Sequence, residues 1–216
     1  MIVPLTHTFL WRCKDRDSLL KGCTKFNTFC TRLENQANAY FPIVENDTEV
    51  IKELQINEIN KYKGDGFELF VEAMIRLFPC DKRLALIEDY EVITGQDVGV
   101  DGHGISGYNN KPITVQCKYR QHDCVLTANR DHLTNFTSAS LMHYNVDQVP
   151  DPITHKLNLV IITSGDSLNF FTDHEMFGEK VYAICRNDIR SLVDNNNTFW
   201  KSFAASWKDS LKKYKA

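Results

Sequence analysis

The sequence of 216 residues lacks several features that would place it in a specialised class. No stretch approaches 18 consecutive apolar residues, so we expect no membrane-spanning helix. The first residues, Met-Ile-Val-Pro-Leu-Thr-His, lack the basic and apolar regions of a signal peptide. We therefore expect a cytoplasmic protein, or one in the host-cell cytoplasm if a virus encodes it, with no membrane partner.

Cysteine pairs and an excess of positive charge are also missing. The seven cysteines are odd in number and form no C-x-x-C pair, which argues against a disulfide framework and a structural zinc site. We expect reduced, mostly buried thiols. A net charge of −3 provides no overall basic field. If the protein binds nucleic acid, the attraction must come from local patches.

Two helical segments carry such patches. Residues 1–42 have apolar side chains at helical spacing, and the basic side chains among them include Arg12, Lys14, Arg16, Lys21 and Lys25. They form either a phosphate-binding face or an ordinary solvated helix surface. The amphipathic helix expected from Phe199 onwards has lysines on its outer face, namely Lys201, Lys208, Lys212, Lys213 and Lys215. It is either a packed terminal helix or a second basic surface that contacts phosphate.

Residues 67–78 show the clearest helical pattern in the chain. The preceding residues 61–66 interrupt the periodicity with two glycines, and Asp65 is predicted to cap the new helix. Glu68 lies at the edge of the apolar stripe and can point toward a buried site. Glu72 lies further out, where it is expected to face water or to pair with Arg76.

A group of polar side chains is predicted at one end of a β-sheet. In a strand over residues 113–119, alternation places Thr114, Gln116 and Lys118 on one face. Asp101 lies in a glycine-rich stretch just before this strand. A carboxylate, an amide oxygen and an ammonium group can therefore converge, hold a divalent cation and activate a water molecule.

The order of the predicted elements indicates the fold class. Further strands are predicted near residues 90–93, 157–164 and 181–185, and helices near 127–143, 170–177 and 188–193. This order favours a mixed α/β core of three layers, with a central mixed sheet flanked by helices, and a helical N-terminal appendage.

The predicted site has the chemistry of a hard-metal centre. Mg²⁺, with Mn²⁺ as an alternative, prefers oxygen ligands. Asp101, Gln116 and the backbone carbonyl of Cys117 can provide them, and Glu68 can add a second carboxylate. Lys118 can orient the attacking water or offset charge on a phosphate. His103 is either an assisting base or phosphate ligand, or a loop histidine without a catalytic role.

Three motifs resemble those of a known family. Phe67-Glu68, Asp97-x-Gly-Val-Asp101 and Val115-Gln-Cys-Lys118 are similar to the PD-(D/E)xK nuclease superfamily. The match is best to its Mrr-like restriction endonuclease branch, in which glutamine commonly replaces the glutamate of the ExK motif. The resemblance covers roughly residues 60–195.

The resemblance implies a restriction-endonuclease-like core and Mg²⁺-dependent hydrolysis of DNA. It assigns Asp101 as the metal-binding acid, Gln116 as the substituted acid, Lys118 as the catalytic lysine and Glu68 as the helix glutamate. Asp97 corresponds to an upstream aspartate with a secondary role.

We therefore expect a DNA-recognising module over residues 1–58 and a nuclease domain over 59–216. The side chains expected to contact DNA are Arg12, Lys14, Arg16, Lys21, Lys25 and Arg120. The hypothesis is a restriction, phage or defence endonuclease. The alternatives are an inactive nuclease-fold module that binds DNA and a structure-specific repair or junction nuclease. A homodimer is a further expectation, since such cores commonly pair to cut both strands.

Overall fold

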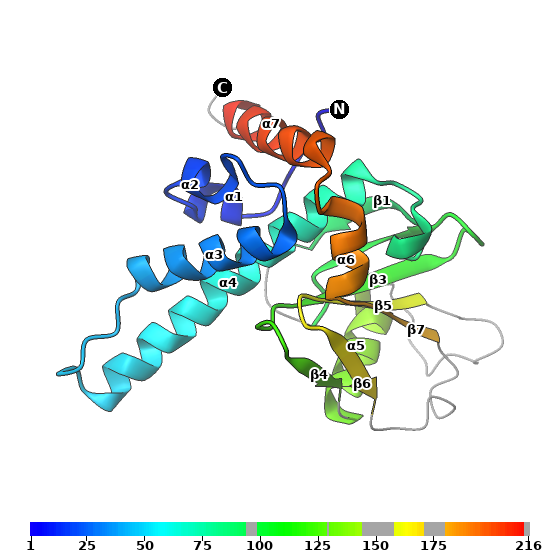
Figure 1. The fold of residues 1–216 in the computed structure, drawn as a ribbon. Coiled ribbons are helices and arrows are strands. Elements are labelled where there is room, and N and C mark those ends of the chain that lie inside the picture. Colours follow the sequence, from blue (N-terminus) through cyan, green and yellow to red (C-terminus); the bar gives the residue numbers. More distant parts are fainter. Residues whose placement is uncertain (94–98, 129, 144–157, 171–179, 214–216) are drawn as a thin grey trace. The chain divides into compact units, whose positions relative to one another are not determined.

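The computed structural model describes residues 1–93, 99–128, 130–143, 158–170 and 180–213, which form two compact units (Figure 1). The first unit combines Met1–Ala73 with Arg190–Ala216, and the second is Met74–Ile189. This division differs from the predicted boundary at residue 58, because one helix runs through that position and the C-terminal helix packs with the N-terminal one. Among the described residues, no helix is both long enough and apolar enough to cross a membrane.

The first unit is helical and has an aromatic core. Its helices are α1 (Phe9–Arg12), α2 (Arg16–Leu20), α3 (Phe26–Tyr40), the part of α4 (Glu49–Leu77) up to Ala73, the end of α6 (Arg186–Val193) and α7 (Asn197–Lys213). Phe29 and Phe70 are fully buried, with ring centroids 5.0 Å apart, and Phe203 of α7 lies 6.1 Å from Phe70. The expected amphipathic C-terminal helix is therefore present, with its apolar side in this core.

Helix α4 is continuous across the predicted break at residues 61–66, so that prediction is wrong. Two glycines are compatible with the helix because tertiary packing overrides local propensity. A Cβ atom on Gly66 would lie 2.5 Å from Leu33 Cδ1, so close packing against α3 favours glycine there. Asp65 lies inside the helix and does not cap it. Its carboxylate instead forms an ion pair with Arg12.

The N-terminal segment is attached to α7 by a row of serines. Val3 N–H donates to Ser206 Oγ, and Leu5 N–H donates to Ser210 Oγ, both over 2.9 Å. Serines four residues apart lie on one side of a helix, while backbone donors two residues apart point to one side of an extended chain. The two periods match here, so these buried N–H groups are satisfied without a β-sheet partner.

The second unit contains the predicted central sheet. The strand order is β1-β2-β3-β5-β7; β2 is antiparallel to both β1 and β3, and β3, β5 and β7 are parallel to one another. The strands are β1 (Ile87–Val92), β2 (Gly102–Ser106), β3 (Pro112–Lys118), β5 (Asn158–Thr163) and β7 (Lys180–Ile184). A mixed α/β architecture with a mixed sheet flanked by helices is therefore confirmed.

Strand β2 lies where the sequence predicts a glycine-rich loop. Its glycines allow close approach of β1, because a Cβ on Gly104 would lie 2.5 Å from the Glu88 carbonyl oxygen. A Cβ on Gly102 would overlap the Tyr90 ring. The glycines are therefore explained by strand packing, and His103 lies in a strand, not in a loop.

One face of the sheet packs on helix α5 (Arg130–His143). Phe136 and Ala139 of this helix share a buried cluster with Leu159 and Ile161 of β5. A separate parallel pair is formed by β4 (Val125–Ala128), which follows β3 in the chain, and β6 (Ser167–Phe170), which follows β5. The helix predicted over 127–143 is present but begins at Arg130, three residues later than predicted. The helix predicted over 170–177 lies outside the described residues except for Phe170, which ends β6.

Candidate active site

The candidate site lies where β2 begins and β3 ends. Asp101 directly precedes β2, and its N–H donates to the Val115 carbonyl over 2.9 Å, which extends the pairing of the two strands. Its Oδ2 accepts a hydrogen bond from Cys117 N–H at 2.5 Å. The carboxylate is therefore directed at the end of β3 by the strand register itself.

Gln116 lies beside this carboxylate on β3. It is 7% exposed, and its Nε2 donates to the Gly99 carbonyl over 2.9 Å. Thr114 shares its face of the strand, as predicted, and its hydroxyl lies 2.8 Å from Ser140 Oγ of α5. Because the amide nitrogen of Gln116 is engaged, its Oε1 is the atom that can coordinate a cation.

The Cys117 carbonyl completes a set of oxygen ligands. The N–H and C=O groups of one residue in an extended strand point to the same side, as the double hydrogen bonds of an antiparallel pair require. Since Cys117 N–H points toward Asp101, its carbonyl faces the same edge. A carboxylate, an amide oxygen and a backbone carbonyl are the ligands of a hard divalent cation, so these residues fit Mg²⁺ or Mn²⁺.

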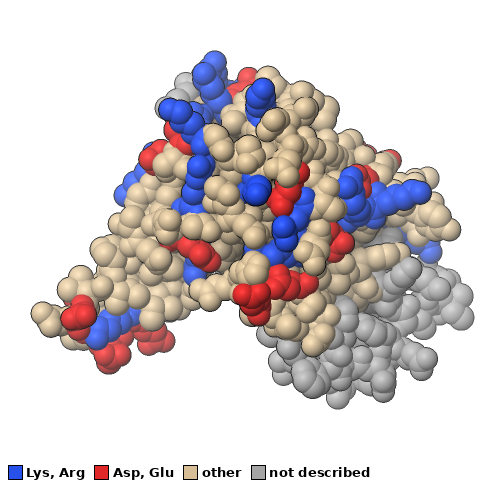
Figure 2. All heavy atoms as spheres, viewed as in Figure 1, with Lys and Arg blue, Asp and Glu red and all other residues tan. Residues whose placement is uncertain are grey.

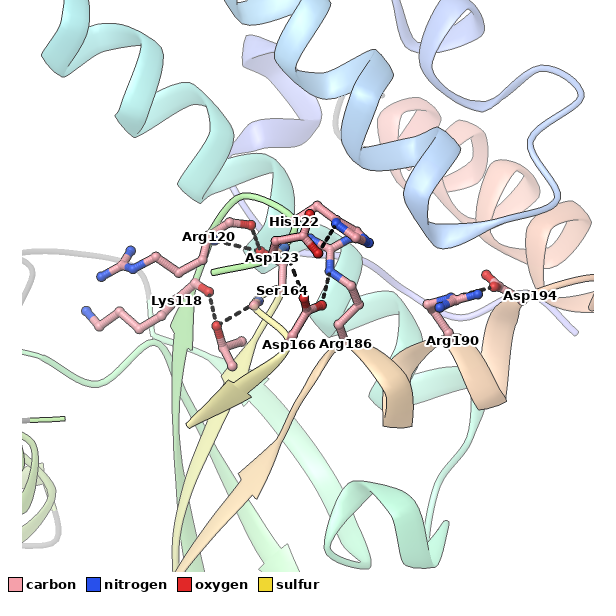
Figure 3. Close-up of polar contacts among 11 residues, drawn as sticks. Lys118, Arg120, His122, Asp123, Ser164, Asp166, Arg186, Arg190 and Asp194 are labelled. Carbon is pink, nitrogen blue, oxygen red and sulfur yellow. Dashed lines mark hydrogen bonds and ion pairs between the residues drawn. The ribbon is translucent and has the colours of Figure 1, made fainter. Parts of the chain in front are cut away.

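Lys118 and Arg120 extend from the end of β3 in the same direction in Figure 3. The end of β5 fixes their backbone. Thr163 Oγ1 donates to the Lys118 carbonyl at 2.9 Å, while Ser164 Oγ accepts from Arg120 N–H at 2.6 Å and donates to the Arg120 carbonyl at 2.7 Å. Both hydroxyl side chains are fully buried, so the two cations project from a rigid base.

Gly165 allows the next turn to approach this base. A Cβ at this position would lie 2.8 Å from the Cys124 carbonyl oxygen, which is a backbone atom. The Thr-Ser-Gly sequence at the end of β5 is therefore required by contacts with the segment that follows β3.

A second polar group at this end of the sheet was not predicted. Asp166 Oδ2 accepts from Asp123 N–H at 3.0 Å, and Oδ1 lies 3.2 Å from Nε of the buried Arg186 (Figure 3). His122, Asp123 and Asp166 present ligand atoms within 4.8 Å of one another. The arginine already compensates Asp166, so this group is better suited to fixing the loops than to binding a cation.

The residues of this second polar group follow β3, β5 and β7. The carboxyl ends of these parallel strands meet at one edge of the sheet, where ligands commonly bind. The sequence signal was therefore the position of Asp166 and Arg186 shortly after the ends of β5 and β7.

Glu68 belongs to the helical unit, and its environment there is defined. His7 Nδ1 accepts from Phe9 N–H at 3.1 Å, so the ring proton is on Nε2, which donates to Glu68 Oε2 at 2.8 Å. The prediction that Glu72 faces water is wrong. Glu72 is fully buried and accepts hydrogen bonds from Thr6 N–H, Thr6 Oγ1 and His7 N–H over 2.8 to 3.0 Å.

The basic residues predicted to contact DNA have different environments. Arg12 forms ion pairs with Asp65 and Glu58, so its charge is largely compensated within the unit. Lys14 lies over the Tyr40 ring, 5.2 Å from the centroid.

The remaining three N-terminal cations are placed differently. Arg16 and Lys21 line a pocket, and Lys25 is exposed at the N-cap position of α3. Asp97, the upstream acid of the resemblance, lies outside the described residues.

Comparisons of the chain with protein-family models, with curated proteins and with solved structures gave no match.

Proposed function

We propose that the chain is a metal-dependent endodeoxyribonuclease with a restriction-endonuclease-like core of three layers. The observation that supports this most directly is the position of Asp101, Gln116 and Lys118 at one end of β2 and β3. An acid, an amide oxygen and a lysine with this spacing suit hydrolysis of a phosphodiester. The chain would act in restriction, in defence or in a phage.

Asp101, Gln116 Oε1 and the Cys117 carbonyl would hold the metal ion. Bound Mg²⁺, or Mn²⁺ in its place, would lower the pKa of a water ligand and stabilise negative charge on the phosphate under attack. Lys118 would orient the water or offset that charge. Arg120, which extends in the same direction in Figure 3, would bind a neighbouring phosphate of the DNA.

Cleavage of supercoiled plasmid tests the assignment. Asp101→Asn retains an acceptor for Cys117 N–H but removes the charge, and Lys118→Ala removes the ammonium group. Each should slow nicking in Mg²⁺ or Mn²⁺ by about 10²-fold or more. Lys111→Ala is the matched control, because Lys111 adjoins the opposite end of β3, and it should cut like the wild type. Equal nicking by all variants would overturn the site.

Gln116→Glu tests the metal separately from the chemistry. A second carboxylate in the ligand set raises the affinity for a divalent cation. The variant should therefore reach its half-maximal rate at a lower Mg²⁺ concentration than the wild type. An unchanged metal requirement would remove Gln116 from the proposed ligand set.

The same assays separate the alternatives. A wild-type protein that retards DNA in a mobility-shift gel but cuts no substrate would be a binding module on a nuclease fold. Cleavage confined to branched DNA would indicate a structure-specific nuclease. Sedimentation with and without DNA would test the expected homodimer, in which two copies cut the two strands.

A further inference from the structure

A pocket of about 560 Å³ lies in the helical unit, beside α2, the turn that follows it and α7. Figure 2 shows Lys and Arg side chains gathered over this region, in the part of the view where α2 and α7 lie in Figure 1. The volume is within the range of about 300–1,000 Å³ that is typical of small-ligand sites.

The charged side chains of the pocket are mainly positive. They come from both ends of the sequence and comprise four cations, Arg16, Lys21, Lys201 and Lys208, with one carboxylate, Asp17. Arg16 binds that carboxylate, with Nη2 2.6 Å and Nε 3.1 Å from Asp17 Oδ1. The pKa of Asp17 is lowered, first by this hydrogen bond and also by the charges of Lys21 and Lys208. The pocket therefore has a positive potential that its one acid does not neutralise.

The walls between these cations are apolar. Leu20 and Trp200 are buried at the base, and Ala204 and Ala205 form the α7 side. The indole N–H of Trp200 donates to the Val193 carbonyl at 2.8 Å, so the ring is held in place. A ligand that suits this pocket has an apolar body together with a concentrated negative charge.

We propose that the pocket binds a nucleotide through its phosphate, either a free nucleotide or the phosphorylated end of a DNA strand. A phosphate monoester carries about −1.5 to −2 charges near neutral pH. Four cations around one pocket match a charge concentrated at one point better than the evenly spaced charges of an internal DNA backbone. The sugar and base would lie against the apolar walls. This inference does not depend on the nuclease site.

Binding can be measured on the full chain in EDTA, so that metal-dependent cleavage is prevented. Calorimetry with deoxyadenosine 5′-monophosphate and with deoxyadenosine tests the free ligand. Fluorescence anisotropy with two 3′-labelled oligonucleotides of one sequence, bearing a 5′-phosphate or a 5′-hydroxyl, tests the strand end. The phosphorylated probe should bind more tightly than its unphosphorylated counterpart in whichever pair is recognised.

Variants localise the binding. Lys201→Gln with Lys208→Gln should weaken binding about tenfold or more, because two charge-assisted contacts are lost. Lys212→Gln with Lys213→Gln is the matched control. It removes the same charge from the same helix outside the pocket, and binding should remain within about twofold of wild type.

Ala205→Phe fills the pocket without changing its charge and should also abolish binding, provided that its circular dichroism matches that of the wild type. If it fails to fold, the lysine variants still decide the result.

If the nucleotide binds and the Lys201 and Lys208 variant loses that binding, the ligand is a free nucleotide. If only the 5′-phosphorylated strand binds, the ligand is a strand end. Equal affinity for the phosphorylated and unphosphorylated probes in both pairs, equal loss in the Lys212 and Lys213 control, or no binding of any probe would overturn the proposal. These binding assays are made in EDTA and require no cleavage, so a failed nuclease site and a failed pocket remain distinguishable.

Discussion

Gly64 and Gly66 of α4 provide a sharp test of the helical unit, because they are two residues apart and differ in their surroundings. Apart from its chain neighbours and the backbone of its own helix, a Cβ on Gly64 would meet no described atom within 4 Å. A Cβ on Gly66 would lie 2.5 Å from Leu33 Cδ1 and 3.1 Å from Phe9 Cζ. Both of these neighbours are fully buried, so neither can move aside into solvent.

The expected effects on the free energy of unfolding have opposite signs. Replacing a helical glycine with alanine stabilises by about 0.5–1 kcal/mol, which is the prediction for Gly64→Ala. Gly66→Ala gains the same propensity but overpacks the core, where the optimal carbon separation is about 3.5–4.0 Å. Overpacking costs about 1–3 kcal/mol. Because the propensity gain cancels between the two variants, their difference measures the overpacking of Leu33 and Phe9 directly.

Urea unfolding followed by tryptophan fluorescence gives the required readout. The three tryptophans, Trp11, Trp200 and Trp207, all lie in the helical unit, so the signal reports on that unit and not on the sheet. Gly64→Ala should raise the midpoint and Gly66→Ala should lower it. Equal stabilisation by both changes would refute the packing of α3 on α4, and destabilisation by Gly64→Ala would refute a continuous helix there.

Two further predictions concern stability. Ser206→Ala leaves the buried N–H of Val3 without its acceptor and should destabilise the helical unit by about 1–3 kcal/mol in the same urea assay. Burial, and then the neighbouring charge of His143, lower the pKa of His103. The unfolded chain therefore binds this proton more readily, and the stability associated with neutral His103 is lost as the pH falls through about 6.5 toward the lower folded value. His103→Asn should lose less stability than the wild type between neutral and mildly acidic pH, and an identical pH profile would contradict the assignment.

The central sheet could be predicted because local sequence and tertiary packing agree there. Strand β5 is a continuous apolar run buried on both faces, and β3 has the alternation that places Thr114 and Gln116 together. At β2 and in α4 they disagree. Glycine weakens both strands and helices, so in the sequence Gly66 and Gly104 indicate breaks. In the structure, glycine is favoured at both positions by a close neighbour, Leu33 for Gly66 and the Glu88 carbonyl for Gly104.

The site could be predicted in part for a similar reason. Asp101 and Gln116 come together through a short antiparallel connection, which a reading of neighbouring segments can anticipate. Asp123, Asp166 and Arg186 come together only when three parallel strands end at one edge. The serine contacts of α7 were not predictable, because a serine every fourth residue also fits an exposed polar stripe.

Glu68 and Glu72, two of the acids of α4, differ in burial and in the number of hydrogen bonds that they accept. Glu72 is fully buried and receives three hydrogen bonds from Thr6 and His7, so both of its oxygens are used to hold the N-terminal segment. Glu68 has a side chain that is 26% exposed and receives a hydrogen bond from the His7 ring on Oε2. A hydrogen-bonded neighbour of this kind typically orients a carboxylate without occupying its second oxygen. The hydrogen bond from His7 therefore engages one oxygen of Glu68, whereas the hydrogen bonds to Glu72 engage both of its oxygens, and only Glu72 is committed entirely to holding the N-terminal segment.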